Sequence, residues 1–111
     1  MTENNKHVLV YSTFPSAGDA ERIGGGLVDR GLAACVNIFP GMTAIYVWEG
    51  KRQSDAEVAM LIKTQAALAE TVVAEVRKAH PYSNPALVVL PIVGGSADFL
   101  TWITEQTTAG R

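Results

Sequence analysis

Residues 32–51 read LAACVNIFPGMTAIYVWEGK and contain the pattern on which the whole architecture depends. Pro40-Gly41 divides this stretch into two strand-like halves, and Glu49-Gly50 marks a turn at its end. In both halves apolar residues alternate with other residues, which is the period of a strand with one buried face. The alternating residues are Val36, Ile38, Ile45 and Val47.

The segment after the turn repeats the alternation. Residues 57–64 (EVAMLIKT) place Val58, Met60 and Ile62 on one side. The two segments therefore predict one long antiparallel hairpin with about 14 residues per arm, whereas an ordinary strand has about 5–6. A short chain cannot cover such a ribbon with its own helices, and uncovered strand edges pair with other chains. The hairpin thus predicts a protein that associates.

Size and composition exclude several classes of protein. A chain of 111 residues, 48% of them hydrophobic, predicts a single domain, residues 1–111, with a buried core. The net charge is −2 and no basic stripe occurs, which argues against nucleic-acid binding. Residues 1–6 are polar and no apolar run is long enough to span a membrane, so we expect a cytoplasmic protein. The one cysteine excludes an internal disulfide framework.

The remaining elements complete an α+β pattern. Residues 7–14 (HVLVYSTF) predict a first strand, and Ser16 with Asp19 predicts the start of a helix that ends near Gly31. A second helix is expected over residues 65–79, and an apolar strand, buried on both faces or at an interface, over residues 87–92. Ser96 can cap a short last helix. The order β-α-β-β-α-β plus a C-terminal helix is the ferredoxin-like split βαβ arrangement.

Two observations argue against an enzyme. Residues 24–26 are Gly-Gly-Gly, but they fall inside the predicted helix and lack the spacing of a phosphate-binding loop, so close packing of the helix is the simpler interpretation. No nucleophile with a paired base and no metalloprotease or hydrolase motif is present. We therefore predict that the chain is not an enzyme.

Cys35 and His80 are the candidate metal ligands. A free cysteine is most often a small buried hydrophobe, and a histidine at a helix end can simply bond the last carbonyl groups. Zinc and copper sites gather three or four ligands, so a site here would need folding, or a second subunit, to bring ligands together.

A second candidate site lies on the second arm of the hairpin and in the segment after His80. The side chains of Asp55, Glu57 and Lys63 share one face of the predicted strand. They could line a ligand cleft at a subunit boundary, or they could form a solvated strand end with an ion pair. The predicted cleft contains Trp48, Asp55, Glu57, Lys63, His80 and Tyr82.

Four runs in order, LAACVNI, PGMTAIYVWEGK, EVAMLIKT and HPYSNPALVVLPI, resemble the CutA family of divalent-cation tolerance proteins. The resemblance implies a homotrimer that responds to metal ions and binds copper(II) or another divalent cation. It also suggests an alternative, a PII-like small-ligand sensor whose subunit clefts bind an anion through Lys63, His80 and Tyr82. The chain has Ala86 where relatives typically carry glutamate, Ser12 where some carry cysteine and Ala79 where some carry a second histidine. These departures weaken the case for tight copper binding of the kind that the resemblance implies.

Overall fold

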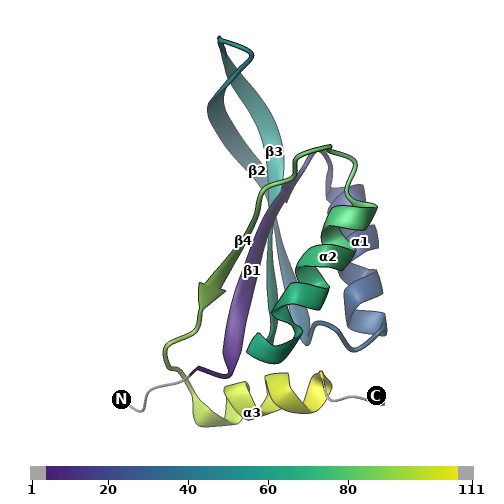
Figure 1. Cartoon of the computed structure of the whole chain (residues 1–111), viewed down its shortest axis with the longest axis vertical. Helices are drawn as coiled ribbons and strands as arrows, with labels where there is room; N and C mark the ends of the chain where they lie inside the picture. The colour runs from purple at the N-terminus through teal and green to yellow at the C-terminus, as the bar shows by residue number, and fades with distance from the viewer. Residues whose placement is uncertain (1–4, 108–111) are drawn as a thin grey trace.

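The computed structural model describes residues 5–107 and has an α+β fold built on one antiparallel sheet (Figure 1). The strands lie in the order β2-β3-β1-β4, so β2 and β4 form the two edges. The elements are β1 (His7–Phe14), α1 (Ala17–Asp29), β2 (Cys35–Trp48), β3 (Lys51–Gln65), α2 (Ala69–Ala79), β4 (Leu87–Pro91) and α3 (Ala97–Gln106). Within the described residues no helix is long and apolar enough to cross a membrane.

The predicted hairpin is confirmed. β2 has 14 residues and β3 has 15, and they pair from Cys35–Lys63 out to Trp48–Lys51. Glu49 and Gly50 connect them with φ angles of 50° and 78°. A two-residue turn with both φ angles positive matches the twist of the strands it joins. The tip projects well beyond the helices (Figure 1).

A β-bulge interrupts the pairing at Pro40-Gly41. Phe39 pairs with Ala59 and Met42 pairs with Glu57, so two residues of β2 stand opposite Val58 alone. Gly41 takes a φ of 82°, which glycine adopts without a steric penalty. Because one residue is added, the alternation changes from even to odd numbers along β2 while the apolar side chains stay on one face of the sheet.

The helices α1 and α2 cover that face. Ser16 caps α1 as predicted, because its Oγ accepts a hydrogen bond from the backbone N–H of Asp19 at 3.1 Å. The side chains without any exposed surface include Val10, Phe14, Leu27, Met60, Ile62, Val72 and Val76. These side chains form one core in which both helices pack against β1 and the part of β3 that pairs with it.

The three glycines differ in what surrounds them. A Cβ at Gly24 would lie 2.8 Å from Met60 Sδ and 2.9 Å from Val36 Cγ2, whereas at Gly25 or Gly26 it would meet nothing within 4 Å. Close packing of the helix on the sheet therefore explains Gly24 alone. Nothing in the structure explains the other two.

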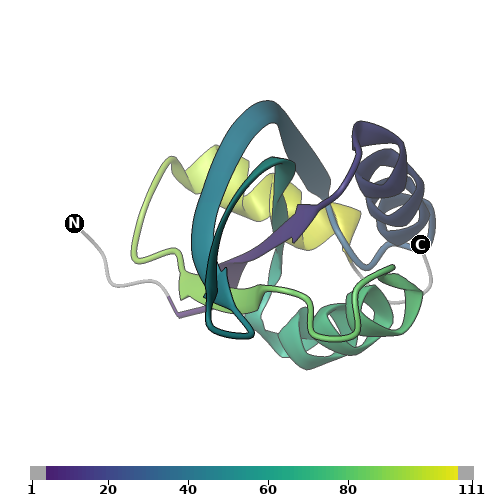
Figure 2. The same ribbon diagram turned by 90° about the horizontal axis from the view of Figure 1, so that it is seen from above.

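The last helix, α3, lies at the end of the sheet far from the hairpin tip (Figure 1) and packs against the face opposite α1 and α2 (Figure 2). Thr104 Oγ1 lies 2.7 Å from His7 Nε2, and Ile103 is fully buried. Lys63 Nζ lies 5.2 Å from the centre of the Phe99 ring, within the range of a cation–π contact.

Three expectations about these elements need correction. Gln65 is the last residue of β3, where it pairs with His7, and residues 66–68 form a 3₁₀ turn before α2 begins at Ala69. Ser96 stands at the start of α3, but its side chain makes no capping bond. β4 is not buried on both faces. It is an exposed edge strand, which leaves only the interface interpretation open.

Candidate functional site

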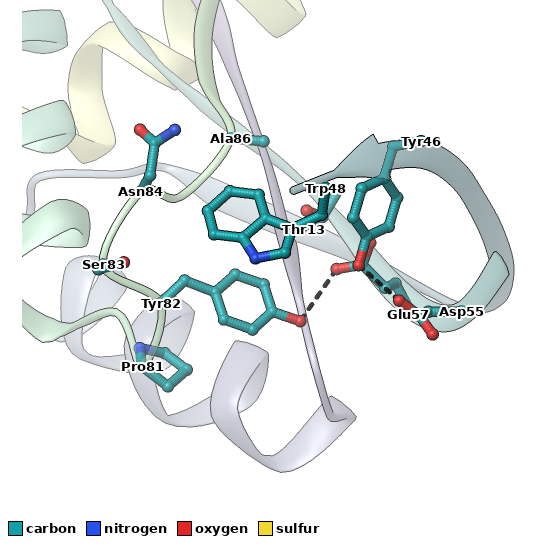
Figure 3. A pocket seen from close by; sticks show the side chains of 10 residues that line it. All are labelled: Thr13, Tyr46, Trp48, Asp55, Glu57, Pro81, Tyr82, Ser83, Asn84 and Ala86. Atoms are coloured by element: carbon teal, nitrogen blue, oxygen red, sulfur yellow. Dashed lines mark hydrogen bonds between the residues drawn. The ribbon is translucent and has the colours of Figure 1, made fainter. Parts of the chain in front are cut away.

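A cavity of about 700 Å³ lies where the hairpin tip leaves the body of the sheet (Figure 3). Its volume falls within the range of small-molecule sites, about 300–1,000 Å³. One wall comes from the outer halves of β2 and β3, and the other from the loop between α2 and β4. The lining residues are Thr13, Tyr46, Trp48, Asp55, Glu57, Pro81, Tyr82, Ser83, Asn84 and Ala86.

The bulge determines which hairpin residues reach this cavity. Beyond it, Ala44 pairs with Asp55, so even-numbered residues of β2 share a face with odd-numbered residues of β3. Tyr46 and Trp48 therefore project on the same side as Asp55 and Glu57. This is the face opposite α1 and α2.

Two tyrosines bond the two carboxylates (Figure 3). Tyr46 donates its hydroxyl hydrogen to Asp55 Oδ2 at 2.5 Å, and Tyr82 donates to Glu57 Oε2 at 3.1 Å. Burial, followed by the hydrogen bond to Glu57, raises the pKa of Tyr82 to about 12. The hydrogen bond to Asp55 likewise raises the pKa of Tyr46. Both hydroxyls therefore stay protonated near neutral pH and act as donors.

The cavity is acidic. Asp55 and Glu57 are its charged lining residues, and no lysine, arginine or histidine is among the residues that line it. Across residues 5–107 neither carboxylate forms an ion pair. The cavity consequently favours a positively charged occupant over an anion.

His80 does not line the cavity but orients the loop that does. The side chain is 8% exposed, and Nε2 lies 2.7 Å from the carbonyl oxygen of Thr13, which can only accept. Nε2 must carry the proton, and Nδ1 accepts the backbone N–H of Tyr82 at 3.1 Å. The ring also stacks on Phe14, with centroids 4.6 Å apart. Both nitrogens are engaged, Nε2 with Thr13 and Nδ1 with Tyr82, and neither bonds the helix-end carbonyls that the sequence suggested.

Cys35 lies far from His80 in the same chain. It pairs with Lys63, whereas the Phe14 that stacks on His80 pairs with Val58. Five residues along β3 correspond to about 17 Å, far longer than any metal–ligand distance. No group of three His, Cys, Asp or Glu side chains suited to a metal occurs within the described part of the chain. A metal site using both residues stays a prediction that requires more than one subunit.

Comparison with known proteins places the chain in a family. The family described as "CutA1 divalent ion tolerance protein" matches residues 8–106. The chain belongs to the CutA1 family. It is 40% identical to the divalent-cation tolerance protein CutA of Pectobacterium atrosepticum, over 89% of this chain and 90% of that protein. It is also 40% identical to the chloroplastic protein CutA 1 of rice, over 90% of this chain.

Solved CutA structures have the same fold. CutA1 from Oryza sativa superposes with a TM-score of 0.90 at 38% identity, covering 95% of this chain and 96% of that one. The periplasmic divalent cation tolerance protein CutA from Archaeoglobus fulgidus superposes with a TM-score of 0.89 at 41% identity, covering 92% and 99%. The chain spans only 56% and 60% of the lengths of the chloroplastic CutA proteins from rice and Arabidopsis thaliana.

Ala86 and Ser12, two of the positions at which the resemblance led us to expect other residues, lie on different sides of the sheet. Ala86 lines the cavity. Ser12 is fully buried on the side of α1 and α2, and its Oγ has no hydrogen-bond partner among residues 5–107. The glutamate and cysteine that the resemblance implies there would not meet in one chain.

Four of the six residues predicted for the cleft line the cavity: Trp48, Asp55, Glu57 and Tyr82. Lys63 does not, because it lies six residues beyond Glu57 on β3, about 20 Å away, beside Phe99. His80 lies behind Tyr82. The expected anion contact by Lys63, His80 and Tyr82 is therefore not assembled in the chain.

The predicted cleft did not include six residues that line the cavity: Thr13, Tyr46, Pro81, Ser83, Asn84 and Ala86. Tyr46 is the aromatic one on the hairpin. The signal was present, because Tyr46 and Trp48 share parity. To place them on the face of Asp55, one must recognise that Pro40 and Gly41 together stand opposite a single residue of β3.

Proposed function

We propose that the protein acts as a homotrimeric, ferredoxin-like divalent-cation tolerance protein that binds copper(II) or another divalent cation weakly. Membership of the CutA1 family supports the role in cation tolerance. No enzymatic step forms part of the proposal. A cytoplasmic location is proposed from the sequence alone, since relatives carry the labels chloroplastic and periplasmic.

The exposed edge at β4 is the observation that carries the assembly. Val88, Val89 and Leu90 are 50%, 44% and 42% exposed, although they form a continuous apolar strand. Such an edge favours pairing with a further strand. The sheet has a second, different edge at β2. Pairing unlike edges of successive copies is a heterologous contact, and such contacts close into rings when the rotation permits. In a three-membered ring, the β2 edge and the β4 edge of every copy are both paired with a neighbour.

The cation is proposed to bind at Asp55 and Glu57. Each carboxylate has one oxygen bonded to a tyrosine, which leaves Asp55 Oδ1 and Glu57 Oε1 available. Two carboxylates are fewer than the protein ligands of a tight zinc, copper or calcium site. A cation held there retains much of its water, which fits weak binding. Copper(II) at His80 and Cys35 would in addition require the imidazole to give up its bond to Thr13 or its bond to Tyr82.

Native mass spectrometry tests the assembly. The metal-free protein is expected at three times the chain mass, and Val88→Lys is expected to shift the mass toward one chain because it places a charge on the free edge. Thr71→Lys, an exposed position on α2, adds the same charge away from both edges and should leave the trimer intact. A wild-type protein that remains one chain at micromolar concentration would contradict the proposal.

Titration with copper(II) and zinc in the same instrument tests the cation. We expect weak uptake that is lost in the Asp55→Asn, Glu57→Gln double variant and kept in Glu70→Gln, a control on the exposed side of α2. Uptake that survives the double variant but disappears in His80→Ala or Cys35→Ala would move the site to the residues predicted from sequence. No uptake by the wild type would contradict cation binding.

The PII-like alternative is less well supported. The family that matches the chain and the relatives from Pectobacterium atrosepticum and Archaeoglobus fulgidus carry cation- or ion-tolerance names. The residues expected to contact an anion also lie apart, with Lys63 at the far end of β3.

A further inference from the structure

We propose that the cavity between the hairpin and the loop before β4 binds an organic ammonium ion, and that it binds a short diammonium more tightly than a monoammonium. The inference goes beyond the proposed function, because it requires neither the trimer nor a metal ion. It rests on three aromatic rings and two carboxylates that line one cavity.

The aromatic rings provide the first part of the argument. Trp48, Tyr46 and Tyr82 are 54%, 42% and 37% exposed, yet all three line the same hollow (Figure 3). Large exposed aromatic side chains grouped around a concave surface indicate a contact surface. The face of an aromatic ring carries negative charge density and attracts a cation, with tryptophan the strongest of the three types. Two rings come from β2 and one from the opposite loop, so a ligand would be held from both sides.

The carboxylates provide the second part. The phenol hydrogens of Tyr46 and Tyr82 are already donated to Asp55 Oδ2 and Glu57 Oε2. The other oxygen of each carboxylate has no hydrogen-bond partner within the described residues and can accept an ammonium N–H. A ligand therefore meets ring faces and free carboxylate oxygens.

The spacing of the two charges favours a diammonium. Asp55 and Glu57 are two residues apart on one face of β3, which places their Cα atoms about 6.5–7 Å apart. No basic side chain among the lining residues neutralises them. Two ammonium groups separated by a short alkyl chain would neutralise both charges, while the chain lies against the rings.

The same surroundings argue against an anion and give a bare metal ion little advantage. An anion would face two carboxylates without a balancing cation. A small divalent ion holds its water tightly and gains little from indole and phenol rings, whereas an alkylammonium group is less strongly hydrated than a divalent ion and can lie against a ring face. The volume of about 700 Å³ also exceeds the needs of a single ion.

Tryptophan fluorescence gives a direct readout, because the chain has only two tryptophans. Trp48 lines the cavity and Trp102 lies on α3. The full chain is titrated with 1,4-diaminobutane, n-butylamine and tetramethylammonium, with 1-butanol and sodium phosphate as controls. We expect a saturable change with the three cations, strongest for the diamine, and none with the controls. Trp102→Phe should keep the response and Trp48→Phe should remove it.

Isothermal titration calorimetry with 1,4-diaminobutane then identifies the contacts. Trp48→Leu and Glu57→Gln are each expected to weaken binding about tenfold, the usual size of a cation–π or charge-assisted contact. Glu70→Gln makes the same charge change on α2 and should leave the affinity unchanged. Trp48→Leu should also leave the uptake of copper(II) or zinc unchanged, which separates ammonium binding from metal binding at the carboxylates that the two ligands share.

Several results would overturn the proposal. Butanol binding as well as butylamine would show an apolar pocket without selection for charge. Equal loss in Glu57→Gln and Glu70→Gln would show general attraction to an acidic protein. Absence of a response to every cation at millimolar concentration would remove the site. Native mass spectrometry reports the trimer and its metal uptake independently. Failure of this inference would therefore leave the proposed function intact, and failure of the proposed function would leave this inference intact.

Discussion

The base and the tip of the hairpin carry the same alternation in different surroundings. At the base, Met60 and Ile62 are completely buried beneath α1 and α2, whereas at the tip Ile45 and Val47, on the same face, are 59% and 68% exposed. The difference follows from length. α1 has 13 residues and spans about 20 Å, while the 14 residues of β2 span about 46 Å. Alternation thus identifies the apolar face, and the length of the helices decides how much of it a single chain can bury.

The largest test of this comparison replaces one apolar side chain at each end. Met60→Ala should lower the free energy of unfolding by about 2–5 kcal/mol, because it leaves a cavity in a packed core. Ile45→Ala should change it by about 0.5 kcal/mol or less when the protein is a monomer. Urea unfolding in the Val88→Lys background measures both. Similar losses at the two positions would mean that the tip is covered within one chain.

A second test compares Gly24, which faces the base of the hairpin, with Gly25, which does not. Gly24→Ala forces a Cβ against Met60 and Val36, and the expected overpacking costs about 1–3 kcal/mol, partly offset by about 1 kcal/mol from helix propensity. Gly25→Ala gains the propensity without the collision, and its thermal midpoint should rise. A higher melting temperature for both variants would show that the helix can move off the sheet at little cost.

Acid should affect the end of the sheet that α3 covers. Burial, followed by the charge of Lys6, lowers the pKa of His7, which contacts Thr104 of α3. The neutral ring is therefore favoured in the folded state. Its contribution is fully present above the ordinary pKa of about 6.5 and is lost as the pH falls below that value toward the folded pKa. Amide exchange in α3 should accelerate over this window relative to α1, and His7→Gln should remove the difference.

Alkali should affect the cavity, and by the smallest amount. The pKa of Tyr82 is raised to about 12, so the protonated phenol is favoured in the folded state. Its stabilising contribution is fully present below the ordinary pKa of about 10 and is lost as the pH rises from there to about 12. An absorbance titration at the wavelength of tyrosinate should show an ionisation near pH 12 that Tyr82→Phe removes, while the raised pKa of Tyr46 is left in place. Ionisation of every tyrosine near pH 10 would contradict the bond to Glu57.

Elements set by local chemistry were predictable from the sequence. β1, the Glu49-Gly50 turn and the Ser16 cap are where alternation, turn residues and capping place them. The start of α2 was not predictable, because Gln65 is held in β3 by His7, which is distant in the sequence. The same holds for the environment of β4, since an apolar run does not show whether its cover comes from the same chain.

The candidate site was predictable in part for a similar reason. Parity placed Asp55 and Glu57 together, and the loop position suggested Tyr82. Parity carries no information on distance along a strand, so Lys63 was grouped with them although it lies about 20 Å away. The internal bond from His80 to Thr13 depends on contact between α2 and β1, which no local pattern records.

Because of the bulge at Pro40-Gly41, the number of residues in β2, and not only their type, decides which side chains of the outer hairpin face the cavity. Deleting Gly41 would restore one-to-one pairing, and each side chain in the outer half of β2 would move to the other face of the sheet. Tyr46 and Trp48 would then exchange sides with Ile45 and Val47, and every side chain would be retained while the aromatic wall of the cavity was replaced by an aliphatic one. A single inserted residue thus determines which face of the outer hairpin is acidic and aromatic and which is aliphatic.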